Sequence, residues 1–193
     1  TEYTRQVAAF VNPAGPVITD LDYVSATSID YTSSFYDGSY SCQTFVPSAD
    51  GLLTGVWVLA SEYNLTTSVD LEVSICRAPG GQPDLSSSPM AVESYDIAST
   101  ELTWCSVVFS NPPYLLGGTS YAIVYYSDTS DFNARNKIYY SQDAGDLYPD
   151  GSRWYYNGST YSEYADTDFL FRTRMIFGTR TYTAPSNTDT VYT

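Results

Sequence analysis

The chain contains no histidine among its 193 residues. Histidine is the commonest general acid and base near neutral pH and the commonest metal ligand in proteins. Its absence excludes a Ser-His-Asp triad, a Cys-His pair and a zinc site with histidine ligands. We therefore expect a protein that binds or assembles and has no enzyme activity.

Basic residues are also scarce. The chain has 8 Lys and Arg residues against 22 Asp and Glu residues, which gives a net charge of -14, and its only lysine is Lys137. Nucleic acids and anionic membranes bind to basic patches, so both are poor partners for this chain. No apolar run approaches the roughly 18 to 20 residues that would cross a bilayer, so we expect no membrane span.

Three cysteines allow at most one internal disulfide. Apolar residues alternate strictly from Val69 to Cys76, so Cys76 shares the outer face of a strand with the polar residues. If Phe45 points into the core, Cys42 also faces outward, whereas Cys105 alternates in phase with buried positions. The pattern predicts a disulfide between Cys42 and Cys76 and a buried free thiol at Cys105.

The start of the chain and two short motifs point to export. The sequence begins at Thr1 and has no signal peptide, so we expect a mature form from which a leader was removed, although a trimmed chain would look the same. Two tripeptides match the N-glycosylation pattern, with acceptors at Asn64 and Asn157. We expect a secreted or extracellular protein.

Short runs of strand-forming residues alternate with turns of Gly, Pro, Asn and Asp from about residue 41 to 178. Such spacing predicts an antiparallel β-sandwich or jelly roll of about nine strands. The predicted strands are Ser41 to Val46, Leu52 to Ser61, Val69 to Arg77, Met90 to Ile97, Leu102 to Ser110, Tyr121 to Ser127, Lys137 to Ser141, Arg153 to Asn157 and Asp168 to Phe177.

Both ends of the chain lie outside this pattern. We expect an N-terminal extension over residues 1 to 37, a sandwich over 38 to 178 and a C-terminal tail over 179 to 193. Each end carries a short β-prone run that would pair with the edge of a sheet in a neighbouring subunit, or alternatively in the same subunit. The predicted strand donors are Val7, Phe10, Val11, Thr181 and Tyr182.

The middle of the chain resembles a known family of modules. Seven short sequence motifs follow one another along this region. They are Gln43-Thr44-Phe45-Val46-Pro47-Ser48, Gly51-Leu52-Leu53-Thr54-Gly55-Val56, Leu71-Glu72-Val73-Ser74-Ile75, Gly80-Gly81-Gln82-Pro83, Trp104-Cys105-Ser106-Val107-Val108-Phe109, Leu116-Gly117-Gly118-Thr119-Ser120-Tyr121-Ala122-Ile123-Val124 and Asp168-Phe169-Leu170-Phe171-Arg172-Thr173. This order resembles the choice-of-anchor β-sandwich domains of secreted and cell-surface prokaryotic proteins and of phage structural proteins. The resemblance covers roughly residues 41 to 174. It implies an exported, jelly-roll-like fold without known catalytic residues, and residues 178 to 193 do not resemble the anchor segment expected after such a domain.

The chain is rich in tyrosine, with 20 residues. Where two aromatic residues are adjacent on a strand, one ring faces the core and the other faces outward. The outward rings would stack against sugars or contact another subunit, or simply form cross-strand pairs that stabilise the sheet. The candidates are Tyr139, Tyr140, Trp154, Tyr155, Tyr156, Tyr161 and Tyr164.

Two acidic loops gather oxygen ligands of the kind that calcium takes. Neither loop has the Asp-x-Asp-x-Asp-Gly spacing of a known calcium loop, and aspartates are ordinary turn residues, so loops without a metal are the simpler explanation. Calcium is the only cofactor that the sequence suggests. Its candidate ligands are Asp128, Asp131, Asp143, Asp146 and Asp150.

Taken together, these patterns favour a secreted or virion-exposed structural protein. Its partner would be further copies of itself, assembled through the terminal segments into a filament, an appendage or a surface layer. The alternative is a carbohydrate-binding module that uses the loops rich in tyrosine and tryptophan.

Overall fold

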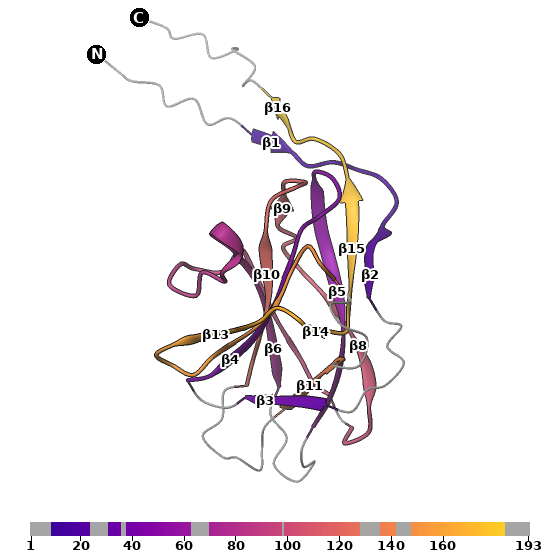
Figure 1. Cartoon of the computed structure of the whole chain (residues 1–193). Coiled ribbons are helices and arrows are strands. Elements are labelled where there is room, and N and C mark those ends of the chain that lie inside the picture. Colours follow the sequence, from indigo (N-terminus) through magenta and orange to yellow (C-terminus); the bar gives the residue numbers. More distant parts are fainter. Residues whose placement is uncertain are drawn as a thin grey trace, which may run out of the picture.

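The computed structural model describes residues 9–23, 31–35, 38–62, 70–97, 99–127, 136–141 and 148–183. These residues form sixteen β-strands and one short 3-10 turn, η2 (Pro79–Gly81). Each of the nine predicted runs forms a strand, and the last of them is divided into two. The prediction of an all-β, antiparallel sandwich is confirmed (Figure 1). Within the described residues, no helix has the length and apolar character needed to cross a membrane.

One layer of the sandwich is a six-stranded antiparallel sheet with the order β13-β12-β4-β10-β6-β7. Its strands are β13 (Tyr161–Tyr164), β12 (Arg153–Tyr156), β4 (Tyr40–Phe45), β10 (Tyr121–Tyr126), β6 (Leu71–Arg77) and β7 (Ala91–Tyr95). Strand β10 therefore lies at the centre, between β4 and β6. The hairpin of β12 and β13 forms one edge of the sheet.

The other layer is an eight-stranded antiparallel sheet around the long strand β5. Its main order is β14-β11-β5-β15-β2, while β3 pairs with β11, and β8 and β9 pair with β5. The strands are β2 (Ile18–Tyr23), β3 (Tyr31–Phe35), β5 (Gly51–Glu62), β8 (Thr103–Val108), β9 (Tyr114–Leu115), β11 (Asn136–Ser141), β14 (Asp168–Phe169) and β15 (Phe171–Phe177).

The main core lies between the two sheets. In β6, alternation turns Leu71, Val73 and Ile75 inward, and all three are fully buried. Phe45 and Phe171, from opposite sheets, meet across the core with their ring centroids 6.4 Å apart. Burial of each large apolar side chain contributes about 1.5–3 kcal/mol, so this layer of side chains holds the two sheets together.

The N-terminal extension predicted over residues 1–37 is corrected by the structure. Strand β2 pairs with β15 and β3 pairs with β11, so both belong to the sandwich. Leu21 and Tyr23 pack against the main core, while the carboxylate of Asp22 forms an ion pair with Arg172 at 3.0 Å. The outward aspartates gave this strand the composition of a loop, although its inward positions are apolar.

The two terminal strands pair with each other. In β1 (Ala9–Val11) and β16 (Thr181–Thr183), Phe10 lies opposite Tyr182 and Val11 opposite Thr181. Figure 1 shows this two-stranded ribbon standing off one end of the sandwich. Among the described residues these segments pair with each other and not with an edge of either sheet, so the same-subunit alternative is wrong for them. Pairing with a neighbouring subunit stays a prediction, and Val7 lies outside the described residues.

The predicted disulfide between Cys42 and Cys76 is wrong. Both thiols are free, and β10 separates their strands, with Val124 opposite Cys42 and Ala122 opposite Cys76. Two strands that flank a third lie roughly 9.5 Å apart, whereas a disulfide requires Cα atoms within about 7 Å. The two cysteines do share the outer face, as expected, and Cys105 is a buried free thiol in the main core.

Candidate functional site on the outer face of the six-stranded sheet

A second apolar cluster lies on the outer face of the six-stranded sheet. Its buried members come from β4, β6, β10 and β12 and from the residue after β6, and they are Cys42, Cys76, Ala78, Ala122, Val124 and Trp154. Most of these side chains are small, so larger groups cover them. Tyr40, Leu85 and Tyr161 pack over the cluster and are only partly buried. An apolar floor with aromatic groups above it therefore faces outward.

Four tyrosines form a continuous row on this face, which we call the aromatic row: Tyr126, Tyr40, Tyr156 and Tyr161. Neighbouring ring centroids are 4.9 Å, 6.1 Å and 4.6 Å apart in that order. The strand register explains the row, because Tyr156 lies opposite both Tyr40 and Tyr161. All four rings are half-buried, so each keeps part of its surface accessible.

The segment between β6 and β7 forms a wall beside the aromatic row. It begins with the turn η2, in which Gly80 and Gly81 have φ angles of 68° and 86° that favour glycine. Its next part folds around the carboxylate of Asp84, which accepts hydrogen bonds from the hydroxyls of Ser86 and Ser87 at 2.6 Å and 2.7 Å. These hydrogen bonds lower the pKa of Asp84 to about 2.

The wall is tied to the aromatic row by a hydrogen bond. The backbone N–H of Leu85 donates to the hydroxyl oxygen of Tyr161 at 3.4 Å. The hydroxyl of Tyr161 is protonated at neutral pH, as in any tyrosine, and can donate to a ligand. Burial raises its pKa further. In Figure 1 the segment that carries η2, in magenta, and the β13 hairpin, in orange, lie on the same side of the sandwich.

Two hollows are lined in part by this wall. The first, which we call the Asp84 hollow, has a volume of about 400 Å³ and is lined by Pro79, Gln82, Pro83, Asp84, Ser86 and Tyr161. The second, the Glu72 hollow, has a volume of about 130 Å³ and is lined by Tyr40, Glu72, Ser74, Cys76, Leu85, Ser87, Pro89 and Val124. Each hollow combines an aromatic ring, a carboxylate and hydroxyl groups.

The predicted aromatic residues divide among several places. Trp154, Tyr156 and Tyr161 come together on the outer face, and the Trp154 and Tyr161 ring centroids are 6.3 Å apart. Tyr155 points to the opposite face of β12, because side chains alternate along a strand. The ring of Tyr164 instead stacks on the guanidinium of Arg153, 3.9 Å from the ring centroid.

The remaining aromatic residues show what the sequence patterns missed. Tyr139 and Tyr140 lie on β11, in the other sheet, and are not part of this face. Tyr40 belongs to the row and no sequence pattern indicated it, whereas Tyr126 belongs to it as the rule for adjacent aromatic residues predicts. Tyr126 follows the buried Tyr125, so the alternation of β10 places it outward, and this pattern was available in the sequence.

The predicted calcium ligands remain a prediction. Asp128, Asp131, Asp143 and Asp146 lie outside the described residues, and Asp150 is exposed in a turn. In the described part of the chain, no three His, Cys, Asp or Glu residues group as a metal site would require.

The predicted glycosylation sites are likewise untested. Asn64 lies outside the described residues. Asn157 is exposed in the turn between β12 and β13, and its side-chain oxygen accepts hydrogen bonds from the backbone N–H groups of Ser159 and Thr160 at 3.0 Å and 2.9 Å.

One comparison with known proteins, that with solved structures, supports the fold class. No family model matches the chain, and no curated protein matches it. Among solved structures, the chain is similar to the one described as the cysteine protease and lectin-like domains of Cwp84, a surface layer associated protein of Clostridium difficile. The TM-score is 0.52 and the identity 16%, and the match covers 73% of this chain and 33% of that one. The matched part is the lectin-like region, so the chain shares its β-sandwich fold.

Proposed function

We propose that this protein is an extracellular or cell-surface β-sandwich that binds carbohydrate without chemical change, through the aromatic row and the two hollows beside it. The observation that carries the proposal is the unbroken row of four half-buried tyrosine rings next to Asp84 and Glu72. The lectin-like name of the matched region in the Clostridium difficile protein supports it. The glycosylation motifs at Asn64 and Asn157 are compatible with an extracellular location.

The chemistry of the face suits a sugar. The C–H face of a sugar ring stacks on an aromatic ring, while its hydroxyls donate to carboxylates and accept from hydroxyl groups. Tyr156 and Tyr40 offer the rings, and Asp84 and Glu72 offer the acceptors. The row is fixed by cross-strand packing and the wall by its internal hydrogen bonds, so little ordering entropy is lost when a ligand binds.

The Asp84 carboxylate is unsuited to act as the general acid in hydrolysis of the sugar. Glycosidases need one carboxyl group that is protonated near neutral pH, to act as the general acid. The pKa of Asp84 is lowered to about 2, so this carboxylate is ionised and serves as an acceptor only. We therefore propose a binding protein that is not an enzyme.

A binding experiment with matched variants tests this function. The protein is run by affinity electrophoresis through gels that contain a panel of neutral polysaccharides, alongside Tyr156→Ala and Tyr155→Ala. Tyr155 is half-buried on the same strand but faces away from the row, so it is the control. We expect Tyr156→Ala to weaken retention by about 3- to 10-fold, as loss of one aromatic contact does, and Tyr155→Ala to leave it unchanged. No retention on any polysaccharide, or equal loss in both variants, contradicts the proposal.

A second candidate function is self-assembly into a filament, an appendage, a surface layer or a virion exterior. It is favoured by exposed apolar residues near the terminal ribbon: Val11, Val17 and Ile18 are 48%, 43% and 41% exposed. Ile18 is the first residue of β2. Among the described strands β2 pairs with β15 alone, so its other edge is available for pairing. Exposed apolar groups beside an open edge favour contact with a second copy.

Analytical ultracentrifugation tests this second function by measuring the mass of the protein in solution as a function of its concentration. We expect concentration-dependent association of the native chain and its loss in Ile18→Lys, because charges block edge pairing. Val108→Lys is the control, since Val108 is 62% exposed on β8, at the opposite edge of the same sheet. A monomer at all concentrations, or equal effects of both variants, contradicts assembly through this edge.

A further inference from the structure

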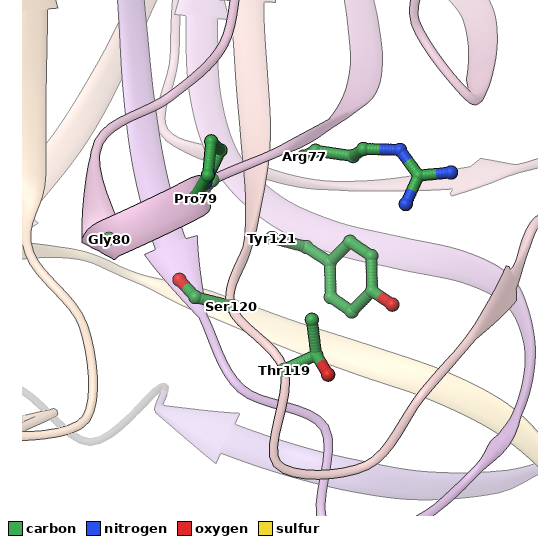
Figure 2. A pocket seen from close by; sticks show the side chains of 7 residues that line it. Arg77, Pro79, Gly80, Thr119, Ser120 and Tyr121 are labelled. Atoms are coloured by element: carbon green, nitrogen blue, oxygen red, sulfur yellow. The ribbon is translucent and has the colours of Figure 1, made fainter.

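A third cavity lies beside the Pro79 turn and is lined by none of the four tyrosines of the aromatic row. Its volume is about 250 Å³, and it is lined by Arg77, Ala78, Pro79, Gly80, Thr119, Ser120 and Tyr121 (Figure 2). We call it the Arg77 cavity. Only the turn residue Pro79 is shared with the Asp84 hollow, so the two openings have different walls and different polar groups.

Arg77 and Arg174 are the two described arginines whose guanidinium groups have no acceptor among the described residues, and of the two only Arg77 lines the cavity. Of the five described arginines, three are held by polar groups: Arg153 donates to a threonine hydroxyl at 2.9 Å, Arg172 pairs with an aspartate at 3.0 Å, and Arg180 donates to an asparagine oxygen at 2.8 Å. Within the described residues, no carboxylate or other acceptor contacts the Arg77 guanidinium. Arg77 is exposed and lines the cavity, so its guanidinium is available to a ligand.

The cavity is built before any ligand arrives. The backbone N–H of Ala78 donates to the carbonyl of Ser120 at 3.2 Å, which ties the end of β6 to the start of β10. The hydroxyl oxygen of Tyr121 accepts the N–H of Leu116 at 2.9 Å, so the ring is held in place. In Figure 2 the Arg77 and Thr119 side chains lie on either side of this ring.

The chemistry of these groups selects one kind of anion. A guanidinium binds a carboxylate through two parallel hydrogen bonds, and hydroxyls such as those of Thr119 and Ser120 donate to further oxygens. One cation neutralises one negative charge, whereas a phosphate dianion would keep an excess charge beside a chain of net charge -14. The carbon-rich remainder of the wall suits the body of a small organic ligand.

We infer that the Arg77 cavity is a second binding site, which takes a carboxylate-bearing ligand and, on this protein, a uronic acid unit. The inference that the ligand carries a carboxylate follows from Arg77 and does not depend on the aromatic row. The choice of a sugar acid over another carboxylate rests on the proposed function. On an acidic glycan, the aromatic row would bind neutral units and the Arg77 cavity a charged one.

Calorimetric titration of the whole chain with D-glucuronate, D-glucose and glucose 6-phosphate tests the inference. We expect glucuronate to bind most tightly of the three. Arg77→Gln should weaken glucuronate roughly tenfold or more, as loss of a charge-assisted hydrogen bond does. Arg174→Gln is the control, because it removes the same charge from β15, outside the cavity, and should change the affinity less than twofold.

Further measurements separate this inference from a folding defect and from the proposed function. Thermal unfolding of Arg77→Gln should match that of the native chain, and Arg77→Lys should keep part of the affinity. Equal affinity for glucuronate and glucose, tighter binding of glucose 6-phosphate, or no effect of Arg77→Gln overturns the inference. Tyr156→Ala should leave glucuronate affinity unchanged. If neutral glycans do not bind and glucuronate still does, the proposed function fails and the Arg77 site stands.

Discussion

The two apolar clusters of this protein lie on opposite faces of the same six-stranded sheet and are built differently. Between the sheets, large side chains such as Phe45 and Phe171 are fully buried. On the outer face, the buried floor is mostly cysteine, alanine and valine, and the large rings, such as Tyr40 and Tyr161, are only partly covered. The inner cluster is sealed by a second sheet, whereas the outer cluster has a rim of hydroxyls and carboxylates that can meet a ligand.

Adjacent residues on β10 illustrate the difference. Tyr125 is fully buried in the main core, where burial raises the pKa of its hydroxyl far above the ordinary range. Tyr126 is half-buried on the outer face and stacks on Tyr40 with ring centroids 4.9 Å apart. The 20 tyrosines therefore have no single role: the inner ones contribute stability, and the outer row contributes accessible surface.

The largest expected effect is on stability in the inner cluster. Phe171→Ala should lower the free energy of unfolding by about 3–5 kcal/mol, because it removes a buried ring and leaves a cavity. Tyr156→Ala, on the half-open outer face, should cost about 1 kcal/mol or less. Urea unfolding of both variants measures the two values, and a similar loss in each would remove the distinction between the clusters.

The thiols give a chemical test of burial on both faces. Cys42, Cys76 and Cys105 are buried, and burial raises the pKa of Cys105 to about 12. Since the thiolate is the reactive form, all three should resist a thiol reagent in the native protein and react only after unfolding. Mass spectrometry after mild oxidation should find no link between Cys42 and Cys76. Such a link in the folded protein would contradict the strand order.

A smaller effect concerns a single buried hydroxyl. Within the described residues the hydroxyl of Tyr125 is buried without a hydrogen-bond partner, which typically costs about 1–3 kcal/mol. Tyr125→Phe should therefore raise stability by about 1 kcal/mol, while Tyr126→Phe, on the outer face, should change it little. Thermal unfolding of the two variants decides the point. A clear loss in Tyr125→Phe would mean that the hydroxyl has a partner.

The smallest effect is local and depends on pH. The folded pKa of Asp84 is depressed, so the hydrogen bonds from Ser86 and Ser87 are fully present above its ordinary pKa and are lost as pH falls towards 2. Because these hydrogen bonds lie at the exposed surface of the wall, global stability should hardly change. The amide signals of Ser86 and Ser87 should shift with a midpoint near pH 2. A midpoint at the ordinary value of about 4 would show that these hydrogen bonds do not form.

The sequence predictions that were confirmed rest on the alternation of apolar and polar residues along single strands. It placed Cys76 on the outer face of β6 and Cys105 in the core, because period-two patterns identify faces. It does not report which strands are neighbours. The disulfide prediction failed for that reason, since Cys42 and Cys76 share a face but are separated by β10.

The candidate site depends on the same missing information. Trp154, Tyr156 and Tyr161 were found because they are close in sequence, on one hairpin. Tyr40 and Tyr126 join them only through the order β12-β4-β10, which is set by long-range pairing. The wall around Asp84 looked like an ordinary serine-rich loop, and nothing local showed that it packs against Tyr161.

The central claim is that the outer aromatic row is the sugar-binding surface. Its most direct test is an NMR titration of the isotope-labelled protein. The ligand is a neutral oligosaccharide cut from the polysaccharide that retains the protein most strongly in affinity electrophoresis, and the amide and ring signals are followed. We predict shifts concentrated at Tyr40, Tyr126, Tyr156 and Tyr161 and along residues 82–89. Shifts that map instead to the eight-stranded sheet, or their persistence unchanged in Tyr156→Ala, would contradict the account.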